Sequence, residues 1–177
     1  MKLYVARHGQ TTANTEEIIC GITDASLNPQ GIDQAKQLGE ELRKIQFDLI
    51  FSSPLKRAYL TGDIVCAKQA CPNIKDERLT EINFGKFEGM PKSTPEFYEF
   101  KRNHGVRYPG GETYFEVVTR VYNFINELKE KYPDKTILLV CHSGIIRTIN
   151  TYFHDCDNDE IFNYVAGNCE LIEYPEL

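Results

Sequence analysis

The chain has 177 residues, a formal net charge of −6 at pH 7, and apolar and charged fractions of 41% and 26%. These fractions are typical of a soluble globular protein, and the length suits one domain with a core of its own. The acidic balance argues against a nucleic-acid partner, because such partners favour a basic surface. No run approaches the roughly 18 apolar residues of a membrane span, so we expect no membrane partner. The start of the chain does not resemble a signal peptide.

Six cysteines occur at positions 20, 66, 71, 141, 156 and 169. They form no C-x-x-C pair, so zinc-ribbon and thioredoxin-like sites have no support. A chain of this length does not depend on disulfides for its stability. We therefore expect reduced cysteines and a cytoplasmic location.

The first half of the chain alternates between strand-like and helix-like runs. Strands are expected at about 2–7 and 48–52, with a polar loop at 8–27 between the first strand and the first helix. Asn28 is a good N-cap and Pro29 suits a first helical position, so a helix begins there. Apolar residues then recur at helical spacing, at Ile32, Ala35, Leu38, Leu42 and Ile45. A second helix is expected from Ser53-Pro54 to about Lys68.

The second half continues this alternation after a weak strand near Ile74 and a loop-rich stretch at 79–112. That stretch is expected to hold one short helix, at about 96–102. A long amphipathic helix is predicted from Thr113 to about Lys131. Its core-facing residues are Val117, Val121, Phe124 and Leu128. A strand at 137–141, a helix at 145–152 and a strand at 170–174 complete the pattern.

This alternation predicts an α/β fold, a three-layer α/β/α sandwich with a mostly parallel central sheet of five or six strands. We expect residues 1–177 to form a single domain with a short cap segment at about 82–112. Two predicted strands run directly into histidines, in Arg7-His8-Gly9 and in His142-Ser143-Gly144. Because functional residues gather at the carboxyl ends of strands in open α/β sheets, both histidines should meet at one edge near the sheet centre.

Four residues are candidates for binding an oxyanion at that edge: Arg7, His8, Arg57 and His142. Arg57 lies near the start of the helix after the second strand, so it reaches the same edge. Arginine binds two phosphate oxygens through its planar fork. A neutral imidazole can attack phosphorus, and neighbouring arginines lower the pKa of a histidine and so favour that neutral form. Backbone N–H groups at Ser143-Gly144, where a helix opens, could also face the anion.

The alkoxide that leaves such a phosphoryl group needs a proton. Glu81 lies in the segment 79–85, which is expected to cover the site. We therefore interpret Glu81 as the general acid, and as the base toward water in the second half of the reaction.

The motifs resemble those of the histidine phosphatase superfamily, also called phosphoglycerate mutase-like. The matching blocks are Arg7-His8-Gly9 with Gln10 to Asn14; Gly21, Asp24, Leu27, Gly31, Gln34 and Ala35; Ser52 to Ala58; Leu79 to Gly89; Pro109 to Glu112; and Val140 to Gly144. They span nearly the whole chain in the expected order. The resemblance implies that His8 is the phosphorylated nucleophile and Glu81 the proton donor. It also implies a phosphate and substrate pocket of Arg7, Asn14, Gly21, Arg57, His142 and Ser143, with no metal and no cofactor.

Two positions depart from the family pattern. Cys20 stands where glutamine is expected, next to Gly21, and Phe87 stands where tryptophan is common. Nearby positive charge would favour a reactive thiolate at Cys20, but we favour an inert thiol. Aromatic residues of the cap could line a leaving-group pocket or simply pack against one another.

Three functions fit these residues: a phosphatase, a cofactor-dependent phosphoglycerate mutase, and a non-catalytic phospho-ligand binding module. The short cap favours a phosphatase over a mutase. The presence of nucleophile, acid and charge clamp together disfavours a binding module. We therefore predict a metal-independent phosphomonoesterase that acts on a small phosphorylated metabolite. Its substrate stays open between α-ribazole phosphate, a sugar phosphate, a phosphoglycerate and others, as does its oligomeric state.

Overall fold

The computed structural model describes residues 1–177 and contains one five-stranded sheet with the order β3-β2-β4-β1-β5. The strands are β1 (Lys2–Arg7), β2 (Leu49–Ser52), β3 (Asn73–Lys75), β4 (Thr136–Cys141) and β5 (Leu171–Tyr174). All neighbours are parallel except β1 and β5, which are antiparallel. The mostly parallel sheet predicted from the sequence is confirmed, with five strands.

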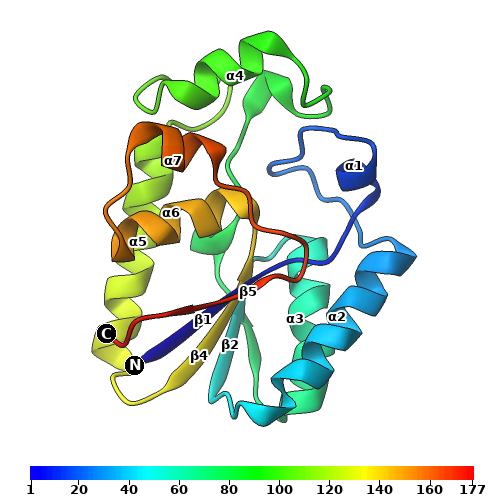
Figure 1. The fold of residues 1–177 in the computed structure, drawn as a ribbon, viewed down its shortest axis with the longest axis vertical. Coiled ribbons are helices and arrows are strands. Elements are labelled where there is room, and N and C mark those ends of the chain that lie inside the picture. Colours follow the sequence, from blue (N-terminus) through cyan, green and yellow to red (C-terminus); the bar gives the residue numbers. More distant parts are fainter.

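Helices cover both faces of this sheet, which confirms the three-layer arrangement. The α-helices of the chain are α1 (Thr12–Thr15), α2 (Pro29–Glu41), α3 (Lys56–Gln69), α4 (Pro95–Arg102), α5 (Tyr114–Lys131), α6 (Ser143–Phe153) and α7 (Asn158–Asn163). In Figure 1, α2 and α3 lie on one side of the strands and α5 and α6 on the other, while α4 and α7 lie together beyond the strand ends. No helix is long and apolar enough to cross a membrane.

The two core layers follow from the side-chain alternation along the central strands. Successive side chains of a strand point to opposite faces. Leu3 and Val5 of β1 thus belong to the core under α5 and α6, whereas Tyr4 and Ala6 belong to the core under α2 and α3. Strand β4 divides its residues in the same way. Both central strands are therefore buried on two faces, and their carboxyl ends are rigidly placed.

The start of α2 agrees with the sequence signals, whereas its end and the start of α3 differ from them. The Asn28 side chain accepts a hydrogen bond from the Gly31 N–H at 2.8 Å, and Pro29 opens α2. Helix α2 ends at Glu41 and continues only as a short 3-10 turn, so Ile45 falls outside it. Helix α3 begins at Lys56, not at Ser53-Pro54, because Ser53 and Pro54 form the turn that leaves β2.

Two short helices were not predicted from the sequence. Helix α1 lies inside the stretch expected to be a loop, and α7 follows the last core helix. Both start with a capping box, from Thr11 to Asn14 and from Asp157 to Glu160. Four to six residues are too few to show helical periodicity, so local hydrogen bonding alone defines these elements.

The parallel pairing of β1 and β4 brings the two histidines together. Arg7 pairs with Cys141 in the ladder, so His8 and His142 leave neighbouring strands at the same level. The His8 N–H donates to the Cys141 carbonyl at 3.0 Å. The loop that begins at Gly9 then presses on the first turn of α2, where a Cβ on Gly9 would lie 2.4 Å from the Gly31 carbonyl oxygen. Glycine is required at this close approach.

Candidate active site

A cleft of about 610 Å³ opens at the carboxyl ends of β1 and β4. Six of the eight sequence-predicted site residues line it: Arg7, His8, Asn14, Arg57, Glu81 and Ser143. His142 and Gly21 lie behind its wall instead. The structure thus brings six of the predicted residues into one cleft and places the other two one layer deeper than expected.

His8 has the geometry of a nucleophile. Its side chain is buried, and Nδ1 lies 2.6 Å from the Gly9 carbonyl oxygen. Because a carbonyl only accepts, Nδ1 carries the proton and Nε2 keeps its lone pair. Burial first, and then the charges of Arg57 and Arg7, hold the pKa of His8 well below its usual 6.5. The two arginines lower this pKa as predicted from the sequence, but burial lowers it more.

His142 is fully buried beside His8, with ring centroids 5.2 Å apart. Its Nε2 lies 2.8 Å from the Ser53 hydroxyl oxygen, while its Nδ1 has no partner in the chain. Burial and the charge of Arg57 also lower the pKa of His142 well below 6.5. A buried ring nitrogen without a partner is costly, which points to an acceptor or donor supplied by a ligand.

Both candidate phosphate-binding arginines are anchored by neutral groups. Arg7 donates from Nη1 to the Ala166 carbonyl at 2.6 Å, and its Nε is buried without a partner. Arg57 donates to the carbonyls of Gly21 and Thr23, both at 2.7 Å. Neither forms an ion pair with a carboxylate, so their positive charge stays available to an anion.

Glu88 supports Arg57 from behind, and sequence reasoning missed it. Its carboxylate accepts hydrogen bonds from the N–H groups of Gly21, Ile22 and Thr23 at 3.0–3.3 Å and from the Thr23 hydroxyl at 2.6 Å. The carbonyls of this same turn hold Arg57. A Cβ on Gly21 would lie 2.0 Å from the Ile82 carbonyl oxygen, so Gly21 builds the wall and does not line the cleft.

Replacing Glu88 with glutamine is expected to loosen this turn, because an amide presents donors where the carboxylate accepts. We expect kcat/KM for a phosphomonoester to fall about tenfold or more, because small displacements of positioning groups lower the reaction rate strongly. Steady-state kinetics and inhibition by inorganic phosphate measure the effect. Glu99→Gln, an exposed change on α4, is the matched control and should behave like the wild type. Equal kinetics for the two variants would remove Glu88 from this role.

Asn14 and Ser143 each keep a donor for the cleft. The Asn14 side-chain oxygen accepts from the Thr11 N–H at 3.0 Å and from the Asn168 amide at 3.2 Å, while its own amide nitrogen has no partner. The Ser143 hydroxyl oxygen accepts from the Ala166 N–H at 3.2 Å. Each side chain is therefore held by hydrogen bonds that its oxygen accepts, and its own N–H or O–H hydrogen remains free to donate into the cleft.

Glu81 is buried and fixed by two backbone donors. Its carboxylate accepts from the Ile82 N–H at 2.9 Å and from the Gly144 N–H at 3.0 Å. A Cβ on Gly144 would lie 2.3 Å from this carboxylate, so a larger residue there would displace the Glu81 side chain. The Gly144 N–H was expected to face the phosphate. That expectation was wrong, because this N–H already donates to the candidate acid.

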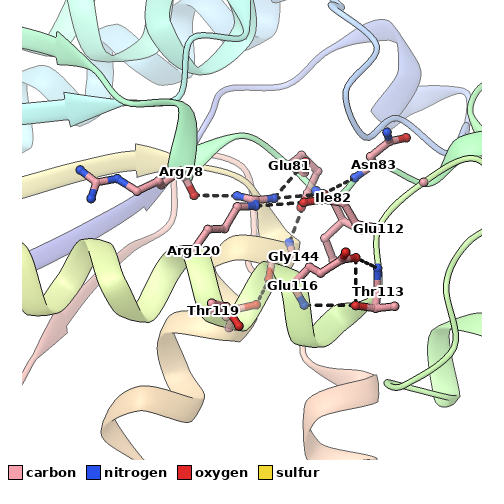
Figure 2. A network of polar contacts seen from close by, with 12 residues as sticks. Arg78, Glu81, Ile82, Asn83, Glu112, Thr113, Glu116, Thr119, Arg120 and Gly144 are labelled. Atoms are coloured by element: carbon pink, nitrogen blue, oxygen red, sulfur yellow. Dashed lines mark hydrogen bonds and ion pairs between the residues drawn. The ribbon is translucent and has the colours of Figure 1, made fainter.

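A polar network behind the cleft holds the loop that carries Glu81 (Figure 2). Arg120 of α5 donates to the Arg78 carbonyl at 2.6 Å and forms an ion pair with Glu112 at 3.2 Å. Glu112 in turn accepts from the Asn83 N–H at 2.9 Å. The long helix thus holds one end of the Glu81 loop directly through Arg120, and the other end through Glu112 of the glycine-rich turn at 109–112.

Comparison with known families identifies the family to which this site belongs. The model of the histidine phosphatase superfamily (branch 1) matches residues 3–174, nearly the whole chain. The chain belongs to this superfamily. The resemblance inferred from the ordered motifs is confirmed.

Relatives of this histidine phosphatase include both phosphatases and mutases. Phosphoserine phosphatase 1 of Hydrogenobacter thermophilus is 31% identical over 95% of this chain and 83% of the relative. A 2,3-bisphosphoglycerate-dependent phosphoglycerate mutase of Cytophaga hutchinsonii is 28% identical over 97% of this chain and 87% of the relative. The structure of a mycobacterial glucosyl-3-phosphoglycerate phosphatase with VO3 matches at 28% identity, with a TM-score of 0.87. The match covers 97% of this chain and 91% of that one.

The remaining cleft wall comes from segments that the motifs do not mark. The C-terminal stretch 164–168 contributes Tyr164, Val165 and Asn168. The cap contributes Phe84, Lys92, Phe97, Tyr98 and Lys101. The other cap aromatics, Phe87, Phe100 and Tyr108, pack on one another at centroid distances of 5.4–6.1 Å. Some aromatic residues of the cap therefore line the cleft, and the others pack beneath them.

Cys20 lines the cleft but lacks the character of a reactive thiol. Burial raises the pKa of Cys20 above its usual value even though Arg57 lowers it. The thiol sulfur lies 3.4 Å from the Thr23 carbonyl oxygen. These observations support the inert interpretation.

The two buried histidines predict a pH dependence of the free energy of unfolding. Unfolded histidine takes up a proton as the pH falls through about 6.5, whereas His8 and His142 stay neutral until a much lower pH. The unfolded state then binds more protons, so the free energy of unfolding falls below pH 6.5, by at most about 1.4 kcal/mol per pH unit for each histidine. Urea unfolding at pH 7.5 and 5.5 should show a smaller loss for His142→Gln than for the wild type. Identical losses would contradict the prediction.

Proposed function

We propose that this chain is a metal-independent phosphomonoesterase that passes the phosphoryl group of a small phosphorylated metabolite first to His8 and then to water. The observation that carries the proposal is the free Nε2 of the buried His8, next to two arginines without ion pairs and in one cleft with Glu81. A nucleophile, a charge clamp and an acid are the groups that such a reaction needs.

Binding places the phosphoryl group against the two arginines. Arg7 and Arg57 donate from their free N–H groups, and the Asn14 amide and the Ser143 hydroxyl add neutral donors. His142 accepts from the Ser53 hydroxyl through Nε2 and donates its unpartnered Nδ1–H to a phosphoryl oxygen. These donors are anchored before the substrate arrives, so they stabilise the equatorial oxygens of the transition state without further reorganisation.

Transfer proceeds in two balanced steps. The Nε2 lone pair of His8 forms a bond to phosphorus as the bond to the leaving oxygen breaks, and Glu81 gives its proton to that oxygen. Glu81, now a carboxylate, then accepts a proton from water as the water oxygen attacks phosphorus. The bond between phosphorus and Nε2 breaks, inorganic phosphate leaves, and Glu81 is protonated again.

Hydrolysis is favoured over transfer to a second hydroxyl by the cap. We propose that segment 82–112 is a short cap within a single domain of residues 1–177, with α4 as its one α-helix. So small a cap leaves the cleft open to water. A mutase is the second candidate, because a mutase also stands among the relatives.

Incubation with p-nitrophenyl phosphate in excess chelator tests the reaction class. We expect steady release of phosphate, and a strict requirement for added metal would overturn the proposal. A second assay offers 3-phosphoglycerate with and without 2,3-bisphosphoglycerate. Phosphate release without isomerisation supports the phosphatase, whereas isomerisation that depends on the bisphosphate would identify the mutase.

A further inference from the structure

Arg147 stands out among the arginines because nothing in the chain neutralises it. It lies on α6, and its side chain is only 8% exposed. It makes no hydrogen bond and no ion pair, and its Nε is buried without a partner. Each of the other seven arginines donates to a backbone carbonyl or pairs with a carboxylate. A buried, unpaired cation lowers the stability of the folded state. Such a residue therefore points to an anionic ligand that binds there.

Lys101 of α4 adds a second positive charge to the same end of the cleft. It lines the cleft together with Arg147, and its ammonium forms no ion pair. Its ammonium lies over the Phe162 ring, 4.5 Å from the ring centroid. Burial first, and then the charge of Arg147, lower the pKa of Lys101 to about 8. The two cations are thus close enough to repel each other.

No carboxylate of the cleft is free to neutralise this pair. Glu17 forms an ion pair with Lys92 at 3.3 Å. Glu81 is held by the backbone donors of Ile82 and Gly144. The cleft therefore carries two separate positive regions, one around the two phosphate-binding arginines and one at Arg147 and Lys101.

The position of Arg147 relates the second region to the leaving group. Arg147 lies three residues after Gly144, about 4.5 Å further along the axis of α6 and on the same face of the helix. Gly144 holds the carboxylate of Glu81, which protonates the leaving oxygen in the proposed reaction. Arg147 thus lies about one helical turn from the group that protonates the leaving oxygen.

We infer that Arg147 and Lys101 form a second anion subsite, and that the substrate is a phosphomonoester whose leaving group carries another oxyanion, either a carboxylate or a second phosphate. The guanidinium fork of Arg147 suits two oxygens of one such group. This inference rests on the proposed phosphatase function and adds the class of substrate to it.

Matched pairs of substrates test the subsite. 3-Phosphoglycerate and glycerol 3-phosphate differ by a carboxylate, and fructose 1,6-bisphosphate and fructose 6-phosphate differ by a phosphate. We expect the wild type to prefer the member with the additional oxyanion, in at least one pair, by tenfold or more in kcat/KM. The pair that shows the preference identifies the oxyanion. Arg147→Met and Lys101→Met should each reduce this preference at least fivefold, chiefly through KM.

Arg102→Met is the control, because Arg102 lies next to Lys101 but pairs with Asp159 and does not line the cleft. It should keep the wild-type preference. Arg147→Met should also melt no lower than the wild type, since it removes an unpaired buried charge. A wild type that cleaves p-nitrophenyl phosphate but prefers the substrate with the additional oxyanion in neither pair would overturn the subsite alone. Absence of all turnover would instead overturn the proposed function.

Discussion

Replacing His8 with alanine is expected to lower kcat for p-nitrophenyl phosphate by about 10⁴-fold or more, because no other group can form the covalent intermediate. The loss should fall on kcat and not on phosphate binding. Arg7 and Arg57 are held by the carbonyls of Ala166, Gly21 and Thr23, and none of these anchors involves the His8 side chain. Stopped assays for kcat, and inhibition or calorimetry with inorganic phosphate, measure the two effects.

His154→Ala is the matched control for this prediction. His154 is exposed at the end of α6 and does not line the cleft, so its removal should leave kcat unchanged. Wild-type turnover by His8→Ala would mean that another residue is the nucleophile. Loss of phosphate binding together with turnover would mean that His8 mainly shapes the pocket.

Glu81→Gln should slow the first chemical step according to the leaving group. Alkyl phosphates release a strongly basic alkoxide and need the proton of Glu81, so their cleavage is expected to fall about 10²–10⁴-fold. p-Nitrophenol leaves as a stable anion, and its release in the pre-steady-state burst should fall much less. Hydrolysis of the phosphohistidine also lacks its base in this variant, so a burst followed by slow turnover is expected. Rapid-mixing kinetics separates the two phases.

Glu17→Gln removes another carboxylate from the same cleft and is the control for charge. Glu17 is exposed and paired with Lys92, so its loss should not depend on the leaving group. Equal losses for alkyl and aryl substrates in Glu81→Gln would show that Glu81 does not protonate the leaving oxygen.

The core of the fold and most of the candidate site could be predicted because their signals are local. Buried strands with continuous apolar runs end in His8 and His142, and the pairing of parallel strands places such ends together. The Asn28-Pro29 start of α2 and the apolar stripe of α5 are equally local. How deep a residue lies in the wall could not be read from the sequence. Gly21 builds the wall of the cleft, and His142 is fully buried, with Nδ1 as its unpartnered atom.

The supporting residues escaped prediction because their partners are distant in the chain. Glu88 binds a turn 65 or more residues earlier, and the segment at 164–168 returns to cover Arg7 and His8 after the last core helix. Gly144 was placed correctly at a helix start, but only the fold shows that Glu81 takes its N–H. Arg147 is the one charged residue of α6, and that isolated charge was a signal that the sequence did contain.

The position of the phosphoryl group on the enzyme tests the central claim most directly. Brief reaction with labelled substrate, followed by a quench in base, traps the phosphoenzyme for peptide mapping and phosphorus NMR. Because Nδ1 of His8 is occupied by the Gly9 carbonyl, we predict acid-labile, base-stable phosphate on Nε2 of His8. Label on Nδ1, on another residue, or in an acid-stable form would contradict the account.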